Sequence, residues 1–465
     1  MRSFFRTYKT ETIIFFVALC VRLFFFLVAL ALSGALDFSF PSIGSDSQDY
    51  LMAARGFLEY GSFFNISSQL PNSYEMPLYP LFLAFVSKLG MSILVVSLLQ
   101  DILMAFVAVM IYRIGLRVSH FVARVGTVLF VFDPANIFYS NFIVTEPFFI
   151  FFTVLAVYVL VESVFKTAKK NFFISGLLLG LATMVRPVGI MLIPGVVIFL
   201  LLTKNVSWRL IALRSCLFLI GLLVVVFPYM VRNKIIFDKW DLSSVAAWQF
   251  LYSHAAHYYA YQNEISVRDA EDIFHQRLAE SVPERYTEYV KNFKSGTLFI
   301  SPYMWDISLG YLKQDPLGYA FWHGLKTLPF FVSDGLRDLA QRMHLIKLDQ
   351  PSFTNLLISK NFVGLREAVF ESTGTFILLV IGFGVWFLLT LFQCLGFAVA
   401  YSHKGFARGL VFACLLFIIT TAAVAGGAVA HSRYRMSVSP FMFLVAAYGI
   451  EHMLKKYHWH IDSAT

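Results

Sequence analysis

Apolar residues along this chain gather in long runs, separated by short loops and by two longer polar segments. A helix needs about 20 apolar residues to cross the hydrocarbon core of a bilayer, so the pattern predicts about ten transmembrane helices. They lie at roughly 13–32, 91–112, 121–140, 143–165, 171–185, 188–203, 210–230, 374–400, 409–430 and 437–454. We therefore expect an all-α polytopic membrane protein.

The two longer segments are expected to lie on the outer side of the membrane. The first, at about 33–90, forms an outer loop, and the second, at 231–372, is rich in aromatic residues. Aromatic residues are scarce in disordered chains, so we expect this second segment to be a folded, largely helical insert. The chain then divides into a membrane module at 1–230, the insert at 231–372 and C-terminal membrane helices at 373–465.

A short amphipathic surface helix is predicted in the first outer loop, between Gly44 and Gly61. Ser45 and Gln48 have the spacing of a capping box, which marks the start of a helix. Apolar residues then recur at helical spacing and give the helix one apolar face. A second surface helix is expected after Pro77, because proline is tolerated in the first turn of a helix.

Basic residues are concentrated in every second loop. The loops that carry them contain Arg2, Arg6 and Lys9; Arg113, Arg117 and Arg124; Lys166, Lys169 and Lys170; Lys204, Arg209 and Arg214; Lys404 and Arg408; Lys455 and Lys456. The positive-inside rule assigns such loops to the cytoplasm. We expect a multi-pass protein of the inner (plasma) membrane, with both termini cytoplasmic.

The composition agrees with this interpretation: 58% of the 465 residues are hydrophobic and only 14% are charged. The net charge of +9 would favour nucleic acid as a partner of a soluble protein. Here the cytoplasmic loops account for it, so we expect membrane lipids and no nucleic acid. The four cysteines fall in apolar runs and give neither a disulfide framework nor a metal-binding pattern.

Charged residues at the outer ends of the spans are the candidates for chemistry, because burying charge in a membrane is costly and usually functional. They are Asp46 with Asp49, Glu146 at the start of a span, Arg186 before Pro187, and the pair Arg433 and Arg435 in the last outer loop. Each also has a purely structural interpretation. The acids would favour the positive end of a helix dipole, and the arginines would contact lipid headgroups.

His254 and His257 are three residues apart and could bind a metal, but the sequence places no carboxylate beside them. Packing and hydrogen bonding are the more common roles of such histidines in an aromatic segment. No phosphate-binding glycine loop is present, which argues against work driven by ATP.

In their order along the chain, these residues resemble the motifs of the GT-C superfamily of membrane glycosyltransferases. The resemblance is to the branch of protein O-mannosyltransferases and lipid A aminoarabinose transferases. In that branch an Asp of the first outer loop is followed by Glu, and by Tyr four residues after the Asp. Asp46 and Tyr50 match this spacing, whereas Ser47 replaces the usual Glu, which weakens the case for a metal.

The later motifs of the branch recur across nearly the whole chain. They are matched by Pro77-Leu78-Tyr79-Pro80, by Tyr139-Ser140 and Glu146, by Arg186-Pro187-Val188-Gly189, by Pro228 with Arg232-Asn233, and by Arg433-Tyr434-Arg435 with Pro440.

This resemblance implies a GT-C-like fold and transfer of a sugar, with inversion, from a polyprenyl-phosphate donor to a lipid, glycan or protein acceptor on the outer face. A carboxylate can act as general base toward the acceptor, and a departing lipid phosphate needs positive charge. Three sets of residues are implied. They are the acids Asp46, Glu146 and Asp49; the phosphate ligands Arg433, Arg435, Arg186 and Arg232; and the lining residues Tyr50, Tyr79 and Tyr139. The resemblance establishes no cofactor with certainty and leaves a divalent metal open.

Two other functions fit the same pattern. A transporter or lipid flippase would use the outer acids as ion sites, although we find no two-fold repeat and the candidate charges lie at the outer ends of the spans. A non-catalytic scaffold that keeps a transferase fold is the other alternative.

Overall fold

The computed structural model describes residues 8–33, 45–65, 70–166, 168–203, 207–291, 297–333, 373–403, 405–426 and 432–456, with the single residues 336, 363, 364 and 366. Nearly all of these residues are helical. The strands within this part of the chain are β1 (Phe64–Asn65) and β2 (Leu70–Pro71), which pair antiparallel as a small hairpin.

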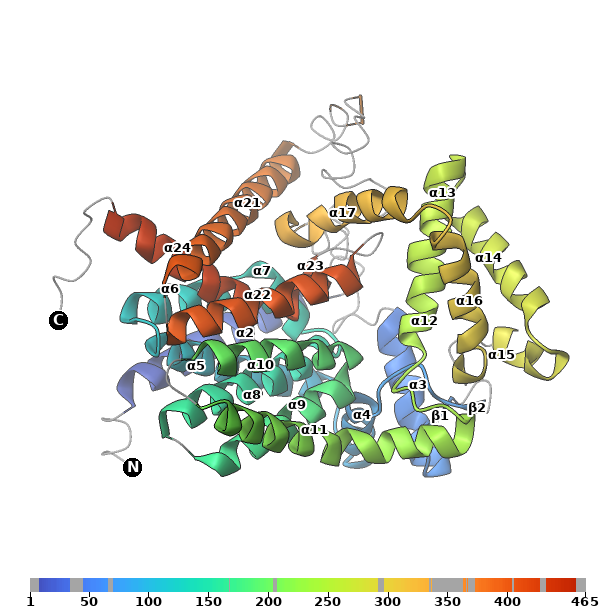
Figure 1. Ribbon diagram of the computed structural model, residues 1–465, viewed down its shortest axis with the longest axis horizontal. Helices are drawn as coiled ribbons and strands as arrows, with labels where there is room; N and C mark the ends of the chain where they lie inside the picture. The colour runs from blue at the N-terminus through green and yellow to red at the C-terminus, as the bar shows by residue number, and fades with distance from the viewer. Residues whose placement is uncertain are drawn as a thin grey trace.

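A body of helices that run side by side holds the predicted spans (Figure 1). Its elements are α2 (Lys9–Leu32), α5 (Leu94–Leu116), α6 (His120–Val131), α7 (Pro134–Ser140), α8 (Glu146–Lys166), α9 (Lys169–Val185), η1 (Pro187–Met191), α10 (Leu192–Leu202), α11 (Trp208–Phe237), α21 (Thr373–Ser402), α22 (Phe406–Ala425), α23 (Ser432–Met436) and α24 (Ser439–Lys456). Each predicted span therefore contains a helix.

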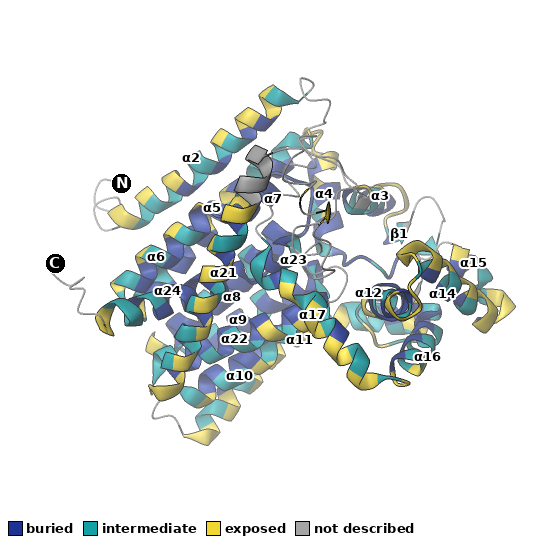
Figure 2. Ribbon diagram, turned by 90° about the horizontal axis from the view of Figure 1, so that it is seen from above, coloured by how far each residue is buried: buried dark blue, intermediate teal, exposed yellow. Residues whose placement is uncertain are grey.

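The predicted count of about ten spans is not confirmed. By length and composition, six described helices can cross a membrane, or seven if α6 and α7, which meet at 53°, form one bent span. The Arg186-Pro187 break leaves α9 with 17 residues and α10 with 11. Helix α24 has 18 residues but includes Glu451, Lys455 and Lys456. The outer faces of the body expose apolar side chains, such as Phe24 and Val224, as expected for contact with lipid (Figure 2).

Glycines allow close packing within the body even where a helix is short. A Cβ added at Gly176 of α9 would lie 1.9 Å from the carbonyl oxygen of Phe218 on α11. One added at Gly221 of α11 would lie 2.1 Å from the carbonyl oxygen of Phe173. Small residues at such crossings let membrane helices approach backbone to backbone.

The first outer loop contains both predicted surface helices, α3 (Ser45–Tyr60) and α4 (Leu78–Lys88), which pack against each other. Gly61 follows α3 with φ of +64°, a left-handed conformation that glycine adopts without a steric penalty. The hairpin of β1 and β2 joins the two helices.

The insert stands at one end of the body, on the right in Figure 1. Its described elements are α12 (Val245–Gln249), η2 (Phe250–Ala256), α13 (His257–Asn263), α14 (Val267–Ser281), η3 (Glu284–Tyr286), α15 (Thr287–Lys291), η4 (Thr297–Phe299), α16 (Ser301–Leu312) and α17 (Pro316–Val332). It has its own apolar core, which includes Leu251, Phe274 and Met304. Helix α11 runs past the predicted boundary at 230, and 337–362 lie outside the described residues.

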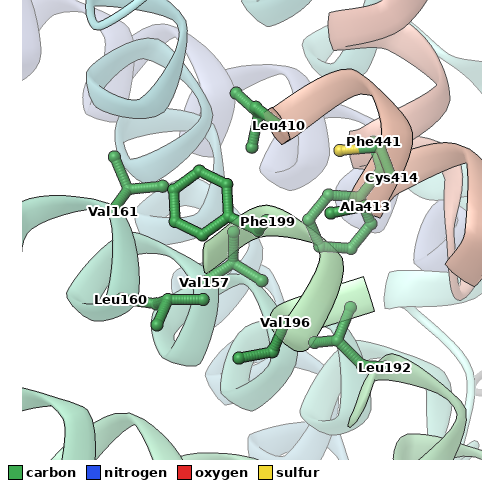
Figure 3. A pocket seen from close by; sticks show the side chains of 10 residues that line it. All are labelled: Val157, Leu160, Val161, Leu192, Val196, Phe199, Leu410, Ala413, Cys414 and Phe441. Carbon is green, nitrogen blue, oxygen red and sulfur yellow. The ribbon is translucent and has the colours of Figure 1, made fainter. Parts of the chain in front are cut away.

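A small pocket opens inside the body between α8, α10, α22 and α24 (Figure 3). Its lining is entirely apolar and includes Val157, Phe199, Cys414 and Phe441. With no hydrogen-bonding group on its wall, this pocket is not suited to a sugar or a phosphate.

A polar group on α5, which we call the α5 clamp (Ser97, Gln100 and Asp101), holds the turn at 140–142 between α7 and α8. Ser97 Oγ donates to the carbonyl oxygen of Asn141 at 3.0 Å, and Ser140 Oγ donates to Asp101 Oδ1 at 2.7 Å. Gln100 Nε2 donates to the carbonyl oxygens of residues 140 and 142, at 2.9 and 2.6 Å. In a membrane interior these carbonyls have no water to bond, so the clamp fixes the segment that leads into Glu146.

Replacing Gln100 with Leu should destabilise the protein, because the buried carbonyl of Ser140 loses its donor and that of Phe142 keeps only the backbone N–H of Val144. The Tyr79 hydroxyl also loses its acceptor, 2.8 Å away. Each unsatisfied buried group costs about 1–3 kcal/mol, so thermal unfolding in detergent should begin at a clearly lower temperature. The matched control is Gln393→Leu on α21, where the buried Nε2 has no hydrogen-bond partner among the described residues. If both variants unfolded like the wild type, the clamp would not contribute to stability.

Candidate functional site

Four charged side chains from distant parts of the chain meet at one end of the body; we call them the charged cluster. Arg433 Nη1 lies 2.7 Å from Asp46 Oδ2, and Arg433 Nε lies 2.8 Å from Glu146 Oε1. Arg186 Nη1 lies 2.5 Å from the same Glu146 oxygen. All four residues were candidates from the sequence, and their charges balance.

The two acids of the charged cluster differ in exposure. The Glu146 side chain is fully buried, whereas 43% of the Asp46 side chain is exposed. Arg433 and Arg186 are 13% and 17% exposed. Glu146 is thus fixed between two guanidinium groups, while Asp46 pairs with Arg433 and still faces outward.

Local sequence explains how these side chains reach one place. Glu146 is the first residue of α8, where the helix dipole favours a negative charge. Arg186 ends α9 in an extended conformation, with φ −144° and ψ 128°, because the following Pro187 disfavours helical geometry in the residue before it. That turn directs Arg186 toward Glu146 and Thr145, whose hydroxyl lies 3.3 Å from Arg186 Nη1.

Two of the predicted lining tyrosines adjoin the charged cluster. The rings of Tyr50 and Tyr79 pack edge to face with centroids 5.4 Å apart, and the Tyr79 hydroxyl donates to Gln100 of the α5 clamp at 2.8 Å. Burial, followed by the charge of Asp46, raises the pKa of Tyr50. The Tyr50 hydroxyl is therefore neutral at physiological pH and can donate a hydrogen bond.

The third tyrosine lies elsewhere. Tyr139 is buried in α7, where its ring packs against Phe138 and Phe142 with centroids 5.0 and 6.1 Å away. These contacts place Tyr139 in the helical core rather than beside the charged cluster.

Ser47 stands where the resembling branch has a Glu, and the structure gives it a structural contact. The residue is buried, and its Oγ donates to the carbonyl oxygen of Ile143 at 2.8 Å. This bond ties α3 to the segment before Glu146. On the same helix, Asp46 and not Asp49 is the acid paired with Arg433.

Arg433 and Arg435 do not act as a pair. The two residues are two positions apart on the short helix α23. This spacing corresponds to a rotation of about 200° around the helix axis, so the two side chains point to nearly opposite sides. Arg435 is buried, donates through Nη1 to the carbonyl oxygen of Phe330 at 3.2 Å, and lies over the Trp386 ring, 3.3 Å from its centroid. It contacts α17 and α21 instead of the acids.

Arg232 is also held by other partners. It donates to the carbonyl oxygens of Asn72 at 2.9 Å and Phe63 at 3.2 Å, and to the side chain of Asn233 at 2.8 Å. Arg232 thereby joins the outer end of α11 to the hairpin of the first outer loop.

Sequence reasoning missed a third acid near the charged cluster. Glu75 is buried and accepts a hydrogen bond from Asn72 Nδ2. Burial and then Glu75 raise the pKa of Tyr74, which also interacts electrostatically with Asp46. The sequence signal that could have identified Glu75 is its position directly before Met76-Pro77, where a surface helix begins.

The two histidines noted in the sequence have separate partners. His254 Nδ1 lies 2.9 Å from the Tyr319 hydroxyl, and His257 Nε2 lies 3.2 Å from Glu271 Oε1. Burial, and then His323, lowers the pKa of His254 to about 4. Among the described residues no group of three or more His, Cys, Asp or Glu side chains is arranged to hold a metal ion.

Comparisons with known proteins find a family model that matches part of the chain. The family model described as dolichyl-phosphate-mannose-protein mannosyltransferase matches residues 74–231. This range includes Tyr79, Glu146 and Arg186, but neither Asp46 nor Arg433. Of the curated proteins, none matches.

A solved structure is similar over most of this chain. It is the crystal structure of the Archaeoglobus fulgidus oligosaccharyltransferase, tethered with an acceptor peptide containing the NVT sequon via a disulfide bond. The TM-score is 0.47 and the identity 11%, over 98% of this chain and 51% of that one. The present chain thus spans about half the length of that protein.

The family match covers the middle of the motif series on which the resemblance was based. The chain is a multi-pass helical membrane protein, and its resemblance to the GT-C superfamily of glycosyltransferases, through the mannosyltransferase family at residues 74–231, is confirmed.

Proposed function

We propose that this protein transfers a sugar, with inversion, from a polyprenyl-phosphate donor to a lipid, glycan or protein acceptor at the outer face of the membrane. One observation carries the proposal. The half-exposed carboxylate of Asp46 forms an ion pair with the guanidinium of Arg433. A second, buried carboxylate, that of Glu146, forms another ion pair with the same guanidinium and holds it in place. A base and an anion-binding cation therefore meet at the outer end of an apolar body that can accommodate a lipid tail.

In this reaction Asp46 accepts the proton of the acceptor hydroxyl or amine. The acceptor atom forms a bond to the anomeric carbon, and the bond from that carbon to the phosphate oxygen breaks. The electron pair stays on the lipid phosphate, which guanidinium groups stabilise. The base and the leaving phosphate lie on opposite sides of the carbon, so Asp46 and Arg433 must separate when the donor enters.

The difference in exposure between the acids supports such an exchange. Ion pairs that reach solvent contribute little to stability, so Arg433 can release Asp46 for a phosphate at small cost. Glu146 is fully buried, and leaving it unpaired would be expensive, so it keeps Arg433 in position. Arg186 is the second phosphate ligand that we propose. Arg232 and Arg435, which donate to backbone carbonyls, support the surrounding structure.

The orientation of the protein belongs to the same proposal. The first residues of α2 and the last residues of α24 lie at the end of the body opposite the insert (Figure 1). Together with the basic loops, this supports cytoplasmic termini and an outer insert in the inner (plasma) membrane.

The site does not fit a divalent metal well. Asp46 and Glu146 are both paired with arginine, and Ser47 supplies a hydroxyl already bonded to a carbonyl. A dication between these carboxylates would lie beside two guanidinium groups and be repelled by them. The same pairing argues against Asp46 and Glu146 as the cation site of a transporter.

The Asp46→Asn variant should fold but lose transfer by about 10²–10⁴-fold, as expected for a missing general base. The assay is transfer of a labelled sugar from polyprenyl phosphate in proteoliposomes. Asp49→Asn is the control on the same helix and should remain active. An inactive Asp49→Asn beside an active Asp46→Asn would show that the wrong acid was chosen.

Arg433→Lys keeps the charge but loses the planar fork that holds two carboxylates and then a phosphate. One lost charge-assisted contact is worth about 1.5–3 kcal/mol, which corresponds to roughly a ten- to hundredfold fall in kcat/KM for the donor. The KM of the acceptor should change little. Arg55→Lys, on the exposed side of α3, is the control. A loss of acceptor affinity with normal donor kinetics would instead place Arg433 at the acceptor.

Treatment with EDTA should leave the transfer rate within about twofold of its untreated value, because arginines already neutralise the carboxylates. The measurement is the initial rate after chelation and dialysis. A rate that disappeared and then returned with Mg²⁺ or Mn²⁺ would refute this part of the proposal.

A further inference from the structure

Helix α17 of the insert has two contrasting faces. Trp322 and Phe330 are buried against the protein. The opposite face is exposed and contains no polar or charged side chain; it is formed mainly by Leu317, Ala320, Phe321, Gly324, Leu325 and Leu328. Leu317 is 83% exposed and Phe321 68%. By contrast α14, in the same insert, exposes mainly polar and charged residues, including Arg268, Asp272 and Glu280.

Hydrogen bonds define how far α17 reaches along the membrane helices. His323 Nε2 lies 3.1 Å from the carbonyl oxygen of Ala423, at the outer end of α22. Eight residues further on, the carbonyl oxygen of Phe331 accepts a hydrogen bond of 3.0 Å from Thr390 Oγ1. Thr390 lies in the middle of the apolar stretch Val380–Ser402 of α21. At 1.5 Å per residue, the eight residues between these two contacts span about 12 Å along the axis of α17, a length comparable to one leaflet of the hydrocarbon core.

The end of α17 has the partners that a helix ending inside a membrane requires. The last carbonyls of a helix lack intrahelical donors, and hydrocarbon supplies none. Here the carbonyl oxygen of Phe330 accepts from Arg435, that of Phe331 accepts from Thr390, and that of Pro329 accepts from the backbone of Ser333. Arg435 also places a positive charge at the negative end of the helix dipole.

The exposed face of α17 continues an apolar surface that already faces lipid. Helix α17 packs against α21 near its C-terminal end, where Phe331 meets Thr390, and its N-terminal end lies at the insert (Figure 1). The neighbouring helix exposes Ile381, Val385 and Leu388. Lys326 is partly exposed, and helical side chains lean toward the N-terminus, which for α17 is the direction of the headgroups.

We propose that α17 is a half-membrane helix: it enters the outer leaflet from the insert, places its apolar face against lipid acyl chains, and ends in the bilayer on the cap formed by Arg435 and Thr390. Arg435 thereby has a positioning role that is separate from the chemistry proposed for Arg433. The inference depends on the membrane body and not on the transfer reaction.

Site-directed spin labelling tests the proposal on the full chain with its four cysteines replaced by alanine. Single nitroxides at 317, 321, 325 and 328 are compared in phosphatidylcholine–phosphatidylglycerol nanodiscs for collisions with oxygen and with a nickel chelate. The oxygen-to-nickel ratio should rise from 317 to 328 and approach that of a label at 388 on α21. A label at 276 on α14 is the aqueous control. Labels at 325 and 328 that met the nickel chelate as 276 does would overturn the proposal, as would shielding from both reagents, which would indicate cover by a second copy or by residues 334–372.

The cap is tested separately with Arg435→Lys and Arg435→Leu. Lysine keeps a charged donor for the Phe330 carbonyl, so the label at 328 should stay at its depth. Leucine removes the donor, and the same label should move outward, with a lower oxygen-to-nickel ratio. An unchanged depth in a folded Arg435→Leu protein would refute the capping role, and Arg435→Lys serves as the folded reference if the leucine variant fails to fold.

Discussion

The structure depends on one guanidinium shared between two carboxylates. Arg433 joins the first outer loop to the start of α8 and to the last outer loop, three segments that nothing in the order of the chain brings together. Glu146 is fully buried and would be strongly unfavourable without cationic partners. The surrounding polar contacts place these groups: the α5 clamp fixes the turn before Glu146, Ser47 ties α3 to it, and the Arg186-Pro187 break supplies the second cation.

Around this site, polar side chains donate hydrogen bonds to backbone carbonyls that have no donor within a helix or strand. Arg232 donates to carbonyls of the hairpin, Gln100 to those of a turn, and Arg435 to the last turn of α17. In water such carbonyls would be hydrated, but next to hydrocarbon each needs a donor from the protein. Several motif residues near the ends of the spans therefore bond to the backbone, and residue type alone does not distinguish this role from contact with a substrate.

The sequence predicted the helical class, both surface helices and the four members of the charged cluster, because apolar periodicity and misplaced charge are local signals. The sequence could not show that Arg433 and Arg435 contact different partners, because this depends on the helical turn of α23. Nor could it show the contacts that Arg232 and Tyr139 make elsewhere. Glu75 was missed because its burial arises from tertiary contacts. The span count differs because α9 and α10, on either side of Arg186-Pro187, are short, because α24 includes three charged residues, and because α6 and α7 meet at 53°.

The pairing of Glu146 with two arginines also has a consequence for biosynthesis. As the ribosome extends the chain, Glu146 and then Arg186 emerge early, whereas Arg433 lies 287 residues beyond Glu146. Arg186 can pair with Glu146 while the middle of the protein is still being synthesised. The first membrane helices then assemble without an unpaired buried carboxylate at Glu146. Asp46 has no such early partner in the charged cluster. The charged cluster therefore closes only after α23, which carries Arg433, has been synthesised and has reached the other segments.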